Sequence, residues 1–206
     1  MLSNGEDREV LEWGSSDRSQ PNVWFNYRTF GRLTLAYTLA LVLAFVFSPN
    51  RAQAQSEDQV KAAFLFNFVR YVEWPSEVFE DDASDVKICM FKAEAFASVV
   101  KQTVSGKNVG DRNVEVDLIG NAGSTRGCHL LYVGVVGEES ISDLVSNLGN
   151  APIFTVSDAE GFAQSGGMAN FFRTDSKIRF EMNPDAAKKA NLKISSRLLR
   201  LARVVK

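Results

Sequence analysis

Histidine and cysteine are scarce in this 206-residue chain, which contains one histidine, His129, and two cysteines, Cys89 and Cys128. A zinc site needs several Cys or His ligands, so we predict no metal site. Cys128 and His129 are neighbours in an expected strand, and their side chains therefore point to opposite faces. They cannot form a catalytic Cys–His pair with each other, and we expect His129 to be a satisfied core or edge residue.

The motifs of common enzyme classes are also missing. The sequence has no serine nucleophile elbow, no His-Glu-x-x-His helix and no phosphate-binding loop. We therefore predict no catalytic residues, no cofactor and a protein that is not an enzyme.

No apolar run is long enough to cross a membrane comfortably. The longest extends only from Leu33 to Phe47, whereas a spanning helix needs about 20 apolar residues. Arg28 and Arg32 precede the run, and the small-x-small pattern at 52–54 follows it, which is typical of a cleaved export signal. We predict a periplasmic protein; the alternative is an inner-membrane anchor formed by residues 33–47.

The segment before the signal is more acidic than basic, although the start of a signal is normally positive. This mismatch indicates that translation begins later, near Val23. We therefore divide the chain into residues 1–54, an extension with the signal, and residues 55–206, a single domain.

The charge of the chain excludes some partners. Its net charge is −2, so no strong field attracts nucleic acid, and we predict no nucleic-acid binding. The basic residues are concentrated in 188–206, which suggests a contact with an acidic partner. The two cysteines suggest a disulfide in an exported protein; the alternative is two buried free thiols.

Hydrophobic periodicity predicts an open, mostly parallel α/β sheet flanked by helices, followed by a β-hairpin and terminal helices. A capping box at 56–59 predicts a first helix from Glu57 to about Val72. The other expected elements are strands at 86–91, 114–119 (at an edge), 129–136 (central) and 152–156, helices at 93–103 and 138–148, a hairpin at 168–173 and 177–182, a helix capped by Asn183, and a last helix from Ser196 to about Val205.

Two helices are candidates for binding a partner protein. The first is apolar on more than one face, and the last has arginines at every third position, 197, 200 and 203, which would form one ridge. The predicted contacts are Phe64, Phe68, Tyr71, Arg197 and Arg200. The alternatives are that the aromatic residues belong to the core and that the arginines are only a solvated face.

A small-ligand site is the competing hypothesis. Ligands of open α/β sheets bind beyond the carboxyl ends of the strands, and the rim there would include Lys92, Ser157, Asp158 and Gly161. The alternative is that the glycines only form turns and that Asp158 caps a short helix at 159–164.

Three sequence blocks resemble the YfiR family of exported bacterial proteins: KAAFLFNFVRYVEWP at 61–75, GCHLLYV at 127–133, and a block from 155 to 205 that begins TVSDAEGFAQSGGMANFF. The resemblance implies a periplasmic regulator that binds and restrains an inner-membrane diguanylate cyclase, which lowers cyclic-di-GMP and biofilm formation. It also implies a homodimer and release by cell-wall or redox stress, with a cell-wall-linked lipoprotein as a further partner.

The cysteines Cys89 and Cys128 match one cysteine pair of that family. The second pair of some members is missing, so redox control through it cannot be transferred to this chain. Related domains also occur beside other signalling systems, which keeps open the alternative of a periplasmic small-ligand sensor.

Overall fold

The computed structural model describes residues 51–206 except 82, 122, 135–137 and 176. Of the predicted extension and export signal at 1–54, residues 1–50 lie outside the described residues. Among the described residues, no helix is both long and apolar enough to span a bilayer.

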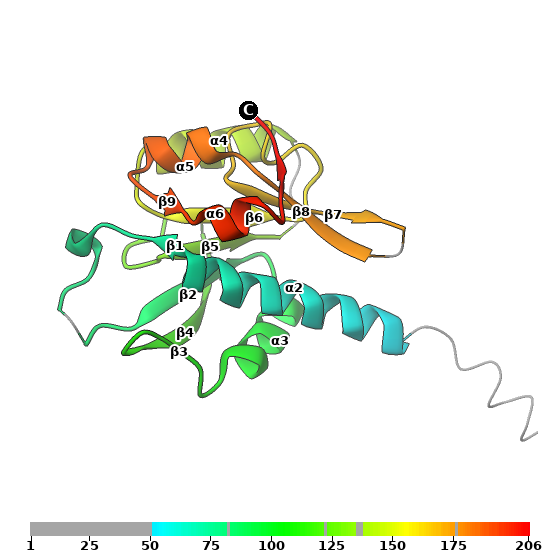
Figure 1. Ribbon diagram of the computed structural model, residues 1–206, viewed down its shortest axis with the longest axis horizontal. Helices are drawn as coiled ribbons and strands as arrows, with labels where there is room; N and C mark the ends of the chain where they lie inside the picture. Colours follow the sequence, from blue (N-terminus) through cyan, green and yellow to red (C-terminus); the bar gives the residue numbers. More distant parts are fainter. Residues whose placement is uncertain (1–50, 82, 122, 135–137, 176) are drawn as a thin grey trace, which may run out of the picture. The chain divides into compact units, whose positions relative to one another are not determined.

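The described part of the chain is built on an eight-stranded sheet with the order β10-β8-β7-β6-β5-β2-β4-β3 (Figure 1). Neighbouring strands from β4 to β7 are parallel, whereas the β7–β8 hairpin and the β3–β4 pair are antiparallel. The strands are β2 Val86–Phe91, β3 Asn108–Val109, β4 Arg112–Ile119, β5 Leu130–Val133, β6 Phe154–Ser157, β7 Ala169–Thr174, β8 Lys177–Met182 and β10 Arg203–Val204. The predicted mostly parallel α/β fold with a hairpin is confirmed.

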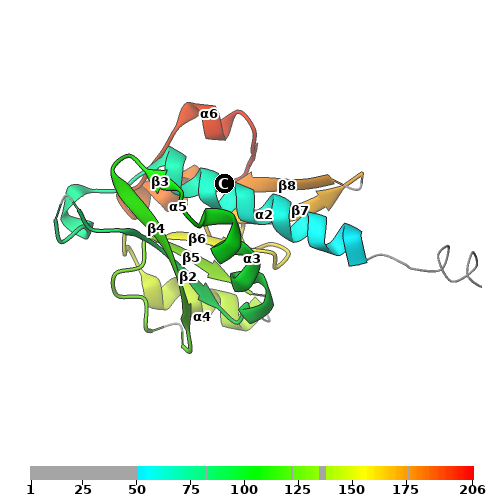
Figure 2. The same ribbon diagram turned by 90° about the horizontal axis from the view of Figure 1, so that it is seen from below.

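The helices cover both faces of this sheet. Figure 2 shows α4 on one side and α2 and α3 on the other. A small second sheet pairs the strand that follows α2 with the strand that follows α5. These elements are α2 Arg51–Tyr71, β1 Val72–Glu73, the 3-10 turn η1 Ser76–Val78, α3 Glu94–Val104, α4 Glu138–Leu148, α5 Pro184–Lys189, β9 Lys193–Ile194 and α6 Ser196–Leu199.

In the part of the chain that the structure describes, two separate apolar clusters form the core. The cluster on the side of α2 and α3, called the α2 side here, also includes residues of α5 and α6; among its members are Leu65, Phe68, Val100, Phe154, Phe180 and Leu198. The cluster under α4, called the α4 side, is smaller and contains Cys89, Cys128, Leu131, Val133, Ile141, Leu144 and Phe162. Strand β5 contributes alternate residues to the two clusters, as a strand covered on both faces does.

A disulfide joins Cys89 in β2 to Cys128, just before the neighbouring strand β5, with a Cα–Cα distance of 5.8 Å. The bond closes a loop of sequence separation 39, which corresponds to roughly 4 kcal/mol in the chain-entropy model. The suggested disulfide is therefore present, and it lies on the α4 side.

The start of the first helix differs from the prediction. Helix α2 begins at Arg51, so Ser56 lies inside it and is not its N-cap. By contrast, Asn183 caps α5 as predicted: the backbone N–H of Ala186 donates to its side-chain oxygen at 2.9 Å.

The predicted last helix is wrong beyond its first turn. Helix α6 ends at Leu199, and the chain returns to the sheet as β10, parallel to β8. The N–H of Val205 donates to the carbonyl of Met182 at 2.8 Å, a strand bond that a helix would not allow. Leu201, which the helix would have buried, is 63% exposed.

The strand predicted at the sheet edge lies next to the edge. β3 pairs with β4 only at Asn113 and Arg112, so the outer side of β4 from Val114 onward has no strand beside it among the described residues.

Candidate partner-binding surface

Phe68 is a core residue and not a surface contact. Its side chain is fully buried, and its ring lies 5.2 to 5.7 Å from the rings of Phe154, Phe171 and Phe180. We therefore correct the prediction that Phe68 contacts a partner. Phe64 is half-buried, and its ring packs against the rings of Phe68, Phe171 and Phe180.

Tyr71, the last residue of α2, lies between two arginines. Arg197 donates to the Tyr71 hydroxyl at 3.5 Å, and its guanidinium lies 5.7 Å from the ring centroid. Arg70 lies over the same ring at 5.6 Å. The hydrogen bond from Arg197 and the charge of Arg70 lower the pKa of the Tyr71 hydroxyl. The ring and the two cations therefore form one aromatic–cationic unit.

Local structure explains why α6 reaches this position. The N–H of Ser195 donates to the carbonyl of Tyr71 at 3.0 Å, which joins the segment before α6 to the end of α2. The Ser195 hydroxyl then accepts the N–H of Leu198 at 3.3 Å and caps the turn. Leu198 is buried, so Arg197 is left on the exposed side.

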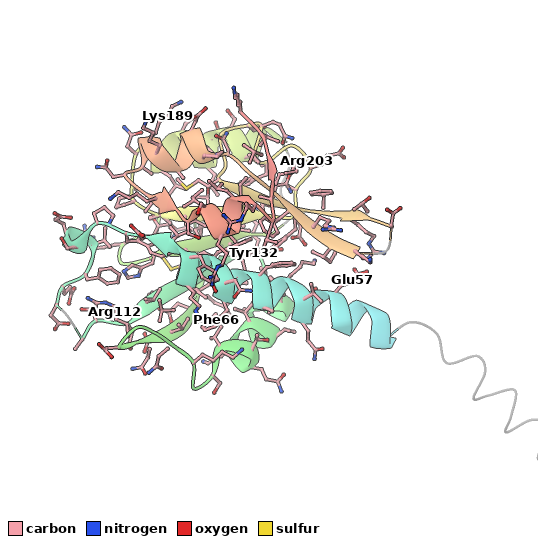
Figure 3. All side chains as sticks on the ribbon, viewed as in Figure 1. Glu57, Phe66, Arg112, Tyr132, Lys189 and Arg203 are labelled. Atoms are coloured by element: carbon pink, nitrogen blue, oxygen red, sulfur yellow. A yellow bond between two sulfur atoms is a disulfide. The ribbon has the colours of Figure 1, made fainter. Side chains whose placement is uncertain are left out.

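A second ring–cation pair lies one turn earlier on α2. Lys107 lies 4.9 Å from the ring centroid of Phe66, and Phe66 is labelled in Figure 3. Phe66 and Arg70 are four residues apart in the helix and so share one face. The name "α2 cationic face" is used below for Phe66, Arg70, Tyr71, Lys107 and Arg197.

The predicted ridge of three arginines is wrong. Arg197 and Arg200 are exposed on α6 and at its C-cap. Arg203 lies in β10, where it pairs with the buried carboxylate of Glu181 and stacks over Phe172 at 4.1 Å. Of the three, only Arg197 contacts α2, Arg200 is exposed at the end of α6, and Arg203 anchors the end of the chain to β8.

Two of the four residues of the predicted ligand rim, Ser157 and Asp158, make internal contacts. Ser157 is fully buried; its hydroxyl donates to the carbonyl of Val133 at 2.8 Å and accepts the N–H of Ala159 at 3.0 Å. This corrects the prediction that Ser157 contacts a ligand. Gly161 forms a turn with φ of 75°, and Lys92 is exposed after β2 with φ of 52°.

Asp158 connects the sheet to α2. Its carboxylate accepts from Lys61 Nζ at 2.6 Å, and residues 159–164 form turns in place of the helix that Asp158 was expected to cap. Burial, together with the charge of Asp158 and a hydrogen bond to it, raises the pKa of Tyr132, which Figure 3 also labels. No spacing pattern predicted the contact between Lys61 and Asp158, because the two residues are 97 positions apart in the chain.

His129 is enclosed by aromatic residues. Its ring stacks on Phe79 at 4.5 Å and meets Trp74 edge-on at 6.1 Å. Its Nδ1 accepts the N–H of Lys87 at 3.0 Å, while the buried Nε2 has no hydrogen-bond partner among the described residues. Burial, followed by the charges of Arg112 and Lys87, lowers the pKa of His129 to about 4. His129 therefore lies in the core, as predicted, but the prediction of a fully satisfied ring is wrong, because only Nδ1 has a hydrogen-bond partner among the described residues.

Sequence reasoning identified Tyr71 and Arg197 of the α2 cationic face and missed the rest. The four-residue spacing of Phe66 and Arg70 was a usable signal for a shared face. Lys107 gave none, since only the packing of α3 against α2 brings it to Phe66.

Comparisons with known proteins agree with this architecture. One solved structure, described as a conserved domain protein from Vibrio cholerae O1 biovar El Tor str. N16961, gives a TM-score of 0.50 at 9% sequence identity. The match covers 72% of this chain but only 60% of that chain, and at this identity it shows the fold alone. The family model described as YfiR/HmsC-like matches residues 58–203. That range includes both sides of the core and all five residues of the α2 cationic face, and the chain belongs to the YfiR/HmsC-like family.

Proposed function

We propose that the chain is an exported, non-enzymatic regulator that binds the periplasmic part of an inner-membrane diguanylate cyclase and restrains it. Proteins of the YfiR/HmsC-like family are periplasmic regulators of cyclic-di-GMP signalling. In this proposal residues 1–54 carry the extension and export signal, and residues 55–206 act in the periplasm as one domain. Restraint of the cyclase lowers cyclic-di-GMP and biofilm formation.

The arrangement of Tyr71 between Arg70 and Arg197 is the observation that carries the proposal. Tyrosine and arginine are enriched at the energetically dominant positions of protein interfaces. Their mutual contacts hold the side chains in place before binding, so less conformational entropy is lost when a partner arrives.

The partner surface that fits is acidic with apolar spots. Arg70, Lys107 and Arg197 each place a cation over an aromatic ring, and a carboxylate can approach each cation from the solvent side. The rings of Phe66 and Tyr71 add apolar area beside the charges. Arg200, exposed at the end of α6, would extend the same contact.

Cyclic-di-GMP in living cells tests the proposal. A strain without the gene, with its cognate cyclase intact, should contain more cyclic-di-GMP, and the wild-type gene should restore the low level. We expect the Arg70→Glu/Arg197→Glu variant not to restore it, because it reverses two charges of the α2 cationic face. Lys188→Glu is the matched control: this exposed lysine lies on α5, outside that face. Restoration by both variants would contradict the proposed surface, and an unchanged level in the deletion strain would contradict the function.

A periplasmic small-ligand sensor is the second candidate. A cavity of about 370 Å³ lies between α4 and α5, with Val145, Leu148 and Met168 as apolar lining and Asn183 and Lys189 as polar lining. Thermal-shift measurements with amino acids and cell-wall fragments test this candidate. Stabilisation that Leu148→Trp abolishes would support it, and no stabilisation by any compound would leave only the protein-binding role.

The resemblance also implies a homodimer and a contact with a cell-wall-linked lipoprotein, and we propose both. Light scattering of the purified protein and co-purification with cell-wall-linked lipoproteins test them directly.

A further inference from the structure

We propose that the outer edge of β4 is a second docking site. It binds an extended segment of another protein as an added β-strand, and in that segment basic and apolar residues alternate. This inference is independent of the α2 cationic face and of the cyclase. It concerns the edge from Val114 to Ile119, which the structure leaves open.

The edge is long and held rigidly. All of its residues, Val114 to Ile119, pair in register with β2 on the inner side. On the outer side β3 reaches only Arg112 and Asn113, so no described strand lies beside the following residues. An open edge of this kind carries a row of backbone donors and acceptors that can accept another strand.

Space for the side chains of an added strand lies beside this edge. A hollow of about 320 Å³ runs between the end of α3 and β4 and is lined by Val104, Val114 and Val116 together with Lys101, Ser105, Gly106, Glu115 and Asp117. Val114 and Val116 are half-buried against the α2 side of the core, and Leu118 is 58% exposed. A docked strand could therefore cover an apolar row, Val114, Val116 and Leu118, on this face of the sheet.

The other face of the edge is acidic. Glu115 and Asp117 alternate with the apolar row, as successive residues of a strand do. Lys87 Nζ lies 3.2 Å from the carboxylate of Asp117, and this ion pair raises the pKa of Lys87. Glu115, by contrast, forms no ion pair with a described residue. A partner strand with lysine or arginine opposite Glu115 would gain a favourable cross-strand pair.

These charges also argue against a second copy of this chain as the occupant. Antiparallel pairing of two β4 edges about a two-fold axis places Glu115 and Asp117 of one copy beside those of the other. Like charges that face each other across strands are destabilising. The edge is therefore protected from self-pairing while it remains complementary to a basic strand.

A designed peptide tests the proposal on the intact protein. The probe is a hexapeptide of alternating lysine and valine, titrated by calorimetry, with amide hydrogen exchange to locate it. We expect binding, with new protection confined to 114–119. Two N-methylated versions of the peptide, blocked on alternate amides, should differ: the version whose methyl groups face β4 loses binding and the other retains it.

Charge variants complete the test. Glu115→Lys/Asp117→Lys should weaken binding of the lysine–valine peptide about tenfold, because each reversed charge turns a cross-strand attraction into repulsion. The same variant should improve binding of a glutamate–valine peptide. The control Glu160→Lys changes an exposed acid in the turn after β6 and should leave both affinities unchanged. Absence of binding, equal binding by both N-methylated peptides, or self-association through 114–119 would overturn the proposal.

Discussion

The two sides of the sheet are held together by different means. On the α2 side, rings of α2, β6, β7 and β8 pack against one another around Phe68, and the same helix carries the α2 cationic face. On the α4 side the cluster is smaller and is closed by the Cys89–Cys128 disulfide. The α2 side therefore combines aromatic packing with the surface proposed for partner recognition, whereas the α4 side has covalent support.

The largest expected effect is on the α2 side. Phe68→Ala should lower the free energy of unfolding by about 3–5 kcal/mol, because it removes a fully buried ring from an aromatic cluster. Denaturant unfolding followed by circular dichroism measures the loss. Leu144→Ala, on the α4 side, is the comparison; a larger loss there would reverse the ranking of the two sides.

The disulfide tests the α4 side. Replacing Cys89 and Cys128 by alanine should cost about 2–4 kcal/mol of unfolding free energy, since the unfolded chain gains the freedom of the opened loop. Restraint of the cyclase should persist at temperatures where the variant stays folded, because the bond lies under α4. Loss of restraint in a folded variant would show that the two sides are coupled.

We expect the pH dependence of stability to arise on the α2 side. Trp74 and Phe79, which pack against the apolar cluster of that side, enclose His129. The pKa of His129 falls to about 4 in the folded protein, against about 6.5 in the unfolded chain. Between pH 4 and 6.5 His129 is protonated in the unfolded chain but neutral in the folded protein. The contribution of His129 to the free energy of unfolding is therefore fully present above pH 6.5 and is lost as the pH falls toward 4. The loss is at most about 3 kcal/mol.

The variant His129→Asn isolates this contribution. An asparagine oxygen can still accept the N–H of Lys87, as Nδ1 does, but it does not titrate. The difference in unfolding free energy between wild type and variant should change across pH 4–6.5. A constant difference would contradict a depressed pKa for His129.

The smallest expected effect on stability is at the α2 cationic face. Arg197→Ala removes an exposed side chain and should change the free energy of unfolding by less than about 0.5 kcal/mol, while it weakens partner binding. Tyr71→Phe, which keeps the ring and removes the hydroxyl, should fall between wild type and Arg197→Ala in binding. A stability loss as large as that of Phe68→Ala would assign Arg197 to the core instead.

Local patterns predicted much of the fold. Strands β2 and β8 appear with the predicted bounds, as does α4, because period-2 and period-3.6 apolar patterns are strong over these lengths. Asn183 before Pro184 predicted its cap for a purely local reason.

Long-range pairing decided what the sequence could not show. Residues 196–205 have a helical pattern, but pairing with β8 and the contact of Arg203 with Glu181 draw the chain into a strand. Phe64, Phe68 and Tyr71 lie on a helix that is apolar on several faces, and only the position of the β7–β8 hairpin decides which ring is buried. The burial of Ser157 was likewise not visible in the sequence, because its hydroxyl donates to the carbonyl of Val133 in another strand.

The most direct test of the central claim is the affinity of the purified exported protein for the periplasmic part of its cognate cyclase, measured by calorimetry at physiological salt. The account predicts binding that Arg70→Glu/Arg197→Glu weakens at least about tenfold, with Lys188→Glu unchanged and all three proteins equally stable. Equal affinity of wild type and the double variant would contradict recognition through the α2 cationic face.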